Sequence, residues 1–169
     1  MKIRLLKLDP DRDIMHAMKW VNDPKVNFYF ANMGKKSIEE ERKFMREILL
    51  SQSDDVFSAY DDDEYVGQVS INRIDWLAET GRLFLVITPS QQGKGYAREI
   101  VNAILKVAFL GLVLNKVWLI VRQENQQRIE MWKACGFIQE GVLREEYKDS
   151  RGKRHDMARL AILKREWSG

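Results

Sequence analysis

The feature that most constrains the fold is a short glycine-rich segment between an apolar strand and a helix. Residues 85–88 form an apolar run that stops at Pro89, and Gly93 and Gly95 precede a helical pattern that starts near Tyr96. Glycines let backbone N–H groups approach a ligand without interference from a Cβ atom. The first turn of the helix leaves unpaired N–H donors, and the helix dipole adds partial positive charge. The segment therefore predicts a site for a phosphate or diphosphate group.

Two common phosphate-binding motifs do not fit this segment. The nucleoside-triphosphatase loop, G-x-x-x-x-G-K-[ST], fails because Lys94 is followed by Gly95 and no glycine stands five positions before Gly93. The dinucleotide-binding motif, G-x-G-x-x-G, fails because Arg98 occupies the third glycine position and residues 113–117 contain no acid. An ordinary strand-to-helix turn is the remaining alternative. The nearby cationic side chains of Lys94 and Arg98 favour an anion site over it.

Hydrophobic periodicity predicts a single α/β domain over residues 1–169. Apolar alternation and short apolar runs indicate strands at 3–8, 56–60, 65–72, 82–88, 116–122, 137–143 and 155–163. Helical spacing and capping residues indicate helices at 10–21, 38–49, 96–110 and 125–134. Antiparallel hairpins lie at both ends and a βαβ unit lies in the middle. This order is typical of a single mixed, largely antiparallel sheet flanked by helices.

Composition excludes several other classes of protein. The single cysteine, Cys135, excludes an intramolecular disulfide framework and a multi-cysteine zinc site. Only His16 and His155 are present, so we expect no metal site, and we expect His16 to face solvent. The longest apolar run, residues 107–114, is much shorter than the ~20 residues of a membrane-spanning helix. No signal peptide is visible, so the expected location is cytoplasmic. The net charge is +3 and the basic residues are scattered among acids, which argues against nucleic-acid binding.

The sequence also resembles a known enzyme family over most of its length. Residues 92–97 fit the pattern Q/R-x-x-G-x-G/A, which resembles the acetyl-CoA loop of the GCN5-related N-acetyltransferases (GNAT). Residues 125–137 are similar to the family segment N-x-x-[ASR]-x-x-x-Y-x-x-x-G-F except at one position. Further similarities lie at residues 20–26, 65–69, 141–147 and 156–158. Together they resemble the branch that includes ribosomal-protein N-terminal acetyltransferases and spermidine acetyltransferases.

The resemblance implies a fold, a reaction and a cosubstrate. It implies a GNAT-like sheet with a splayed central strand pair, and acetyl transfer from acetyl-CoA to a primary amine by direct attack in a ternary complex. The residues that it places on the cofactor are Val86, Ile87, Thr88, Gln92, Gly93, Lys94, Gly95, Tyr96, Ala97, Arg98, Asn125 and Arg128. Asn125 has a plain helix N-cap as its equally weighted alternative role. Dimers are common among relatives, so the resemblance leaves a monomer and a homodimer as alternatives.

The acceptor is expected to be a small-molecule or peptide amine. The early loop would contribute Phe28 and Tyr29 to its pocket, and the closing strands would contribute Glu145 and Glu146. These two acids and the acidic turn at residues 61–64 favour a cationic acceptor. Ordinary core packing for the aromatic residues and solvation for the acids are the alternative interpretations.

Two positions depart from the family pattern in the residues that usually handle protons. Trp132 stands where the family carries the tyrosine acid, and indole donates a hydrogen bond but does not titrate at ordinary pH. Arg82 stands where the branch often carries a glutamate base. Tyr147 is the candidate replacement acid, and Trp132 is expected to pack in the core with Ile129. These departures leave a second hypothesis open, a non-catalytic acyl-CoA-binding or sensing module.

Overall fold

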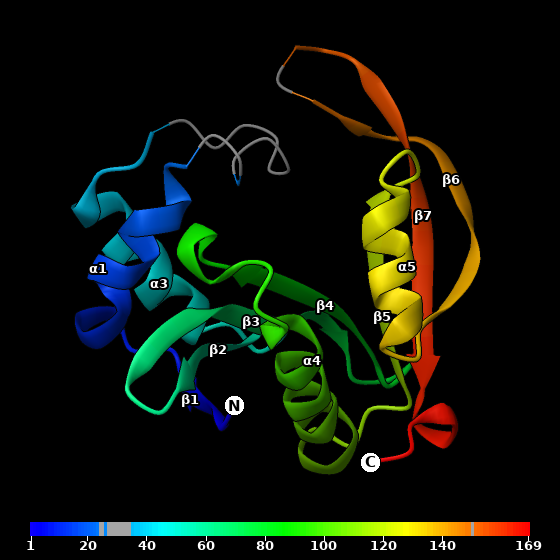
Figure 1. Ribbon diagram of the computed structural model, residues 1–169, viewed down its shortest axis with the longest axis horizontal. Helices are drawn as coiled ribbons and strands as arrows, with labels where there is room; N and C mark the ends of the chain where they lie inside the picture. Colours follow the sequence, from blue (N-terminus) through cyan, green and yellow to red (C-terminus); the bar gives the residue numbers. More distant parts are fainter. Residues whose placement is uncertain (24–25, 27–34, 150) are drawn as a thin grey trace.

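A computed structural model of the protein describes residues 1–23, 26, 35–149 and 151–169 (Figure 1). The strands are β1 (Ile3–Lys7), β2 (Asp55–Asp61), β3 (Glu64–Asp75), β4 (Thr80–Ile87), β5 (Lys116–Arg122), β6 (Ile138–Lys148) and β7 (Arg154–Leu163). The helices are α1 (Pro10–Val21), α3 (Ile38–Leu49), α4 (Tyr96–Lys106) and α5 (Gln126–Ala134), with short helical turns η1 (Pro89–Gln91), η2 (Val107–Gly111) and η3 (Lys164–Glu166). One seven-stranded sheet has the order β1-β2-β3-β4-β5-β7-β6. The predicted fold class is confirmed.

Local capping signals explain where the first two helices begin. Asp9 accepts hydrogen bonds from the backbone N–H groups of Asp11 and Arg12, and Pro10 occupies the first helical position of α1. Ser37 and Glu40 form a reciprocal capping box at the start of α3. Both starts agree with the sequence-based prediction.

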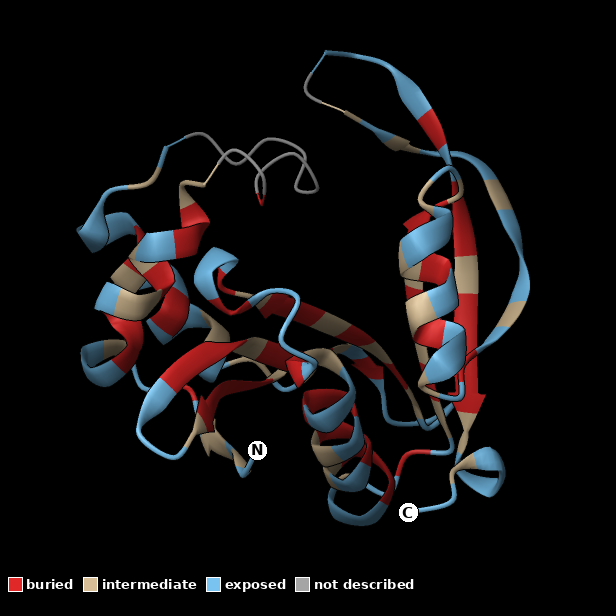
Figure 2. Ribbon diagram, viewed as in Figure 1, coloured by how far each residue is buried: buried red, intermediate tan, exposed pale blue. Residues whose placement is uncertain are grey.

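The sheet separates two hydrophobic cores, which appear as buried residues on both of its faces (Figure 2). Ile100 and Ile104 of α4 pack on one face, where α5 also contributes Ile129 to the core. Ile14 of α1 and Met45 of α3 pack on the opposite face. The helices therefore cover the two faces of the sheet in pairs, α4 with α5 and α1 with α3.

Among the strands that the structure describes, β4 and β5 are the only parallel neighbours, and they separate after a short pairing. Their register joins Thr80 to Lys116, Gly81 to Val117 and Arg82 to Trp118. Beyond Arg82 the two strands diverge (Figure 1), whereas β4 remains paired with β3 along its length. The splayed central pair that the resemblance implied is present.

Several predicted boundaries were wrong. The strand predicted at 137–143 extends to Lys148 as β6, with irregular pairing to β7 after Leu143 and a positive φ of 51° at Glu145. Thr88 lies beyond the end of β4, where its Oγ1 donates to the Val66 carbonyl at 3.1 Å. The helix predicted at 96–110 changes at Val107 into a π-helical turn. His16 does not simply face solvent, because its ring stacks on Tyr65 with centroids 4.6 Å apart.

Candidate active site

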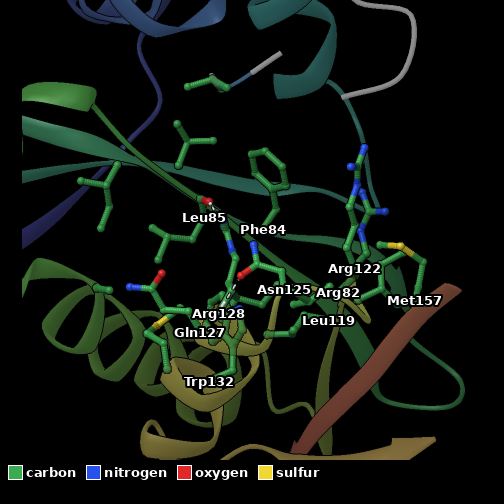
Figure 3. A pocket seen from close by; sticks show the side chains of 18 of the residues that line it. Arg82, Phe84, Leu85, Leu119, Arg122, Asn125, Gln127, Arg128, Trp132 and Met157 are labelled. Carbon is green, nitrogen blue, oxygen red and sulfur yellow. Dashed lines mark hydrogen bonds between the residues drawn. The ribbon is translucent and has the colours of Figure 1, made fainter. Parts of the chain in front are cut away.

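A cleft of about 980 Å³ occupies the space between the diverging strands (Figure 3). Its walls come from β4, β5 and the first turns of α5, and its lining includes Leu85, Leu119 and Met131. Because β4 and β5 do not pair beyond Arg82, the β4 backbone that faces the cleft is not hydrogen bonded to β5. The cleft therefore combines apolar walls with peptide groups that a ligand can reach.

The glycine-rich loop lies at one end of this cleft and leads into α4. Gly93 and Gly95 have φ values of 78° and 88°, in the left-handed region that favours glycine. No side chain caps the N-terminus of α4, whereas Asp9, Ser37 and Asn125 cap α1, α3 and α5. No side chain among the described residues accepts a hydrogen bond from the first N–H groups of α4, which is the arrangement that binds anions at helix N-termini.

Two side chains brace the loop from within. The Lys94 ammonium donates to Gln91 Oε1 at 2.8 Å, and the Gln92 amide donates to the Ile87 carbonyl at 3.0 Å. The second contact ties the loop directly to the end of β4. These bonds hold the loop in place next to the cleft.

The structure separates the twelve residues predicted to bind the cofactor into two groups. Those that line the cleft are Val86, Ile87, Gln92, Ala97, Asn125 and Arg128. Those that are not among the lining residues are Thr88, Gly93, Lys94, Gly95, Tyr96 and Arg98. Tyr96 turns toward the sheet, where its hydroxyl donates to Asp61 at 3.0 Å, and this bond raises the pKa of Tyr96. Its side chain is therefore directed away from the cleft.

Asn125 and Arg128 connect α5 to the cleft. Asn125 Oδ1 accepts the backbone N–H of Arg128 at 3.1 Å, so this residue is an N-cap. Both side chains also line the cleft, and the Arg128 guanidinium donates to the Leu85 carbonyl of β4 at 3.4 Å. The predicted cap is present and Asn125 still faces the cleft.

Three aromatic residues line the cleft, Phe84, Trp132 and Tyr147, and the last two carry a polar group. Trp132 is buried beside Ile129, with its ring 5.4 Å from Phe137, and one side of it lines the cleft. Tyr147 is half-buried on β6, lines the cleft, and lies beneath the Arg122 guanidinium at 5.1 Å from the ring centroid. Of these two, only the Tyr147 hydroxyl is an ionisable group.

Arginines supply the charge of the cleft. Arg82, Arg122 and Arg128 line it, and the described lining residues include no aspartate or glutamate. Arg82 Nε donates to Asn72 Oδ1 at 2.7 Å. Burial, followed by repulsion from Arg73, lowers the pKa of Arg82. Sequence reasoning missed Arg122, although strand alternation with the core residues of β5 could have assigned it to the opposite face.

The two acidic residues predicted for the acceptor site do not line the cleft. Glu145 and Glu146 are exposed on β6 and are not among the lining residues. The Glu145 N–H donates to Asp156 at 2.7 Å. Phe28 and Tyr29 lie outside the described residues.

Other kinds of site find no support in the described part of the chain. No group of three potential metal ligands occurs among the described residues. Burial raises the pKa of the Cys135 thiol, and Cys135 is not part of the cleft lining. Within the described segments, no helix has the length and apolarity needed to cross a membrane.

Comparisons with known proteins agree with this geometry. The acetyltransferase (GNAT) domain family matches residues 2–138. A spermidine N(1)-acetyltransferase from Vibrio cholerae serotype O1 is 33% identical over 102 residues, which cover 60% of this chain and 58% of that protein. An uncharacterized N-acetyltransferase, p20, from Bacillus licheniformis is 27% identical over 99% of this chain and 94% of its own length.

A solved structure extends the similarity to the whole fold. The spermidine N-acetyltransferase from Vibrio cholerae, solved in complex with CoA and spermine, superposes with a TM-score of 0.89 at 26% identity, over 97% of this chain and 96% of that one. The expected recognition, fold and acetyl-CoA cosubstrate are confirmed. The protein described here belongs to the GNAT acetyltransferase family.

Proposed function

We propose that this protein transfers the acetyl group of acetyl-CoA to a primary amine by direct attack within a ternary complex. The observation that carries the proposal is the position of the uncapped α4 N-terminus, which lies at one end of the cleft between the diverging strands β4 and β5. The V. cholerae relative that was solved with CoA and spermine supports a small amine as the acceptor.

The chain's own residues fit this cosubstrate. The N–H groups of the loop at 92–97 and of the first turn of α4 would hold the diphosphate, with Lys94 and Arg98 adding positive charge at its edge. The cleft-facing backbone of Val86 and Ile87 would bind the pantetheine amides, with Asn125 on the other wall. When bound, the thioester supplies the acetyl group that is transferred.

Proton handling differs from the usual family arrangement. A free amine has a pKa near ~10 and must lose a proton before attack, and the departing thiolate benefits from a donor. Trp132 cannot supply a proton at ordinary pH. We assign the donor role to Tyr147, whose side chain lines the cleft from β6. Alignment of the two reactants and polarisation of the carbonyl by backbone N–H groups supply the remainder of the catalysis.

The wider setting is also part of the proposal. We propose that residues 1–169 act as one domain, as a monomer or a homodimer, in the cytoplasm and without a membrane or nucleic acid. The continuous sheet, which joins β1 at one edge to β6 at the other, supports the single domain. The scattered basic residues favour a small acceptor.

The decisive test is release of the CoA thiol from acetyl-CoA in the presence of a panel of primary amines. We expect amine-dependent thiol release, with the acetylated amine identified by mass spectrometry. Tight CoA binding without turnover of any amine, unchanged in Trp132→Tyr, would instead support the acyl-CoA-binding or sensing module. Hydrolysis of acetyl-CoA without an acetylated product would also contradict the proposal.

Substitution at the loop tests the cofactor site directly. Gly93→Val is expected to raise the KM for acetyl-CoA about tenfold or more, because a β-branched residue disfavours the left-handed backbone that directs the loop N–H groups. The matched control is Gly152→Val, since Gly152 has a similar φ of 84° but lies in the turn between β6 and β7. Both variants carry comparable backbone strain of about 1–2 kcal/mol. Equal KM values for the two variants would place the diphosphate elsewhere.

A further inference from the structure

We propose that the amine acceptor also carries an oxyanion group, a carboxylate or a phosphate, and that Arg82 and Arg122 bind this group. The inference rests on the proposed acetyl transfer and narrows its acceptor class. It is carried by two cationic side chains that line the cleft from β4 and β5 (Figure 3).

Strand geometry places both arginines on one face of the sheet. Arg82 is paired in register with Trp118, and side chains alternate between the faces of a strand. Leu83 and Leu85 on β4, and Val121 on β5, belong to the core that contains α4. Arg82 and Arg122 have the opposite parity and therefore leave the sheet on the face of α1 and α3.

This placement separates the pair from the expected diphosphate site. The loop at 92–97 opens α4, which packs on the other face of the sheet. Arg82 also lies five residues before Ile87, a length of roughly 16 Å along a strand. Lys94 within the loop and Arg98 directly after it are the cations that we expect beside the diphosphate. We therefore place Arg82 and Arg122 beside the acceptor rather than beside the phosphates of the cosubstrate.

The balance of charge around the two arginines favours an anion. No described residue on the cleft wall is acidic, and residues 24–25, 27–34 and 150, which the structure does not describe, contain no acid in the sequence. Glu124 forms an ion pair with Arg122 at 3.9 Å, and it is shared, because the same carboxylate oxygen lies 2.8 Å from His155 Nδ1. Arg82 has Asn72, a neutral amide, as its hydrogen-bond partner, and it interacts electrostatically with the acid Asp54 and with the cation Arg73. The cleft wall therefore has a clear excess of positive charge.

Side-chain contacts hold the two guanidinium groups in position before any ligand binds. Arg82 is fixed by its 2.7 Å hydrogen bond to Asn72. Arg122 is buried and its guanidinium lies over the Tyr147 ring. Guanidinium groups that are held in this way bind carboxylate and phosphate strongly, because little rotamer freedom is lost and the surroundings screen charge weakly.

The same charges help the reaction. Cations near an ammonium group lower its pKa, because they disfavour the protonated form. An acceptor whose oxyanion is bound by Arg82 and Arg122 would therefore release its amine proton more easily, in a site where residue 82 is not a carboxylate base. A polyamine such as spermine carries several positive charges and would be repelled by the same residues.

The test compares matched pairs of amines that differ only in the oxyanion group. We would measure kcat/KM by thiol release for amino acids against their decarboxylated amines, and for glucosamine 6-phosphate against glucosamine, with spermidine as the polycationic probe. At least one oxyanion-bearing member is expected to exceed its partner by about 100-fold, since a polar site discriminates strongly against an analogue that lacks the bound group. The carboxylate and phosphate pairs identify which oxyanion is used.

Variants assign that preference to the two arginines. Arg82→Gln and Arg122→Gln are each expected to reduce the preference about tenfold or more while the KM for acetyl-CoA stays unchanged. If the buried position does not tolerate glutamine, Arg122→Lys, which keeps the charge, replaces Arg122→Gln as the test variant. The control is Arg4→Gln, because Arg4 binds Asp63 on the β1 edge of the sheet.

Each outcome tests either the acetyl transfer itself or the preference for an oxyanion-bearing acceptor. Turnover that favours spermidine or the decarboxylated amines overturns the inference and leaves acetyl transfer intact. The inference is also wrong if the arginine variants slow both members of a pair equally. If no amine is turned over, acetyl transfer fails, and calorimetric titration of the same pairs into the CoA complex tests the binding site alone. Binding that is independent of the oxyanion, or absent for all members, then overturns the inference.

Discussion

Replacing Asp13 by alanine is expected to lower the free energy of unfolding by about 3–5 kcal/mol, because the carboxylate is a buried acceptor for several donors. Asp13 is fully buried in α1. Its oxygens accept Arg12 Nε at 2.7 Å, Ser58 Oγ at 2.6 Å, the Tyr60 hydroxyl at 2.8 Å and the Asp9 N–H at 3.0 Å. Removal leaves the buried hydroxyls of β2 without their acceptor. Chemical denaturation monitored by circular dichroism measures the loss.

The control and the pH dependence distinguish this network from a general effect of charge. Asp11 lies in the same first turn but is exposed, so Asp11→Ala is expected to change stability by about 0.5 kcal/mol or less. Burial raises the pKa of Asp13, but the hydrogen bonds from Arg12, Ser58, Asp9 and Tyr60 outweigh it and the pKa is lowered. Asp13 therefore binds fewer protons when folded, and its stabilisation is complete above its unfolded pKa of ~3.9.

As the pH falls below ~4 and through the folded pKa of Asp13, this stabilisation is lost. The difference in unfolding free energy between wild type and Asp13→Ala should therefore narrow at acid pH. A difference that stays constant down to the acid limit of the fold would show that the ionised carboxylate is not what stabilises α1 on the sheet.

Local signals made the first half of the fold predictable. The caps at Asp9 and Ser37 have a mechanism that is visible in a few neighbouring residues, and both helices begin where those residues indicate. The extension of β6 was not predictable in this way. Residues 144–148 contain no apolar alternation, and the strand continues because it pairs with β7 around an irregularity at Glu145. Pairing between distant segments, rather than local preference, decides that boundary.

Six of the twelve residues predicted for the cofactor line the cleft, whereas neither of the two acids predicted for the acceptor does. The glycines of the loop and the asparagine cap carry a local meaning, and the parting of β4 and β5 followed from the family resemblance. The acidic residues Glu145 and Glu146 suggested a cationic acceptor. The cleft wall instead carries Arg82 and Arg122, from two strands that only the sheet brings together. A charged residue in the sequence indicates the charge of the acceptor only when the fold shows that its side chain faces the cleft.

The second large expected effect is a loss of stability at Gly67, where the backbones of β3 and β4 approach each other closely. Gly67→Ala is expected to destabilise the fold by about 3 kcal/mol, because the new Cβ would overlap the Val86 carbonyl oxygen and lie 3.0 Å from the Ile87 Cα. The obstruction is backbone in the paired strand β4, so no side-chain rotation relieves it. Because Val86 and Ile87 line the cleft, the displacement should also raise the KM for acetyl-CoA.

The control for this prediction is Gly141→Ala on β6, where a Cβ atom meets nothing within 4 Å. That variant is expected to remain within about 0.5 kcal/mol of wild type. Thermal and chemical unfolding measure stability, and thiol release at varied acetyl-CoA measures the KM. Because the new Cβ would displace β4, we expect both quantities to change together in Gly67→Ala. A destabilised variant with an unchanged KM would mean that the cosubstrate does not depend on the position of β4, and the proposed pantetheine contacts at residues 86 and 87 would have to be abandoned.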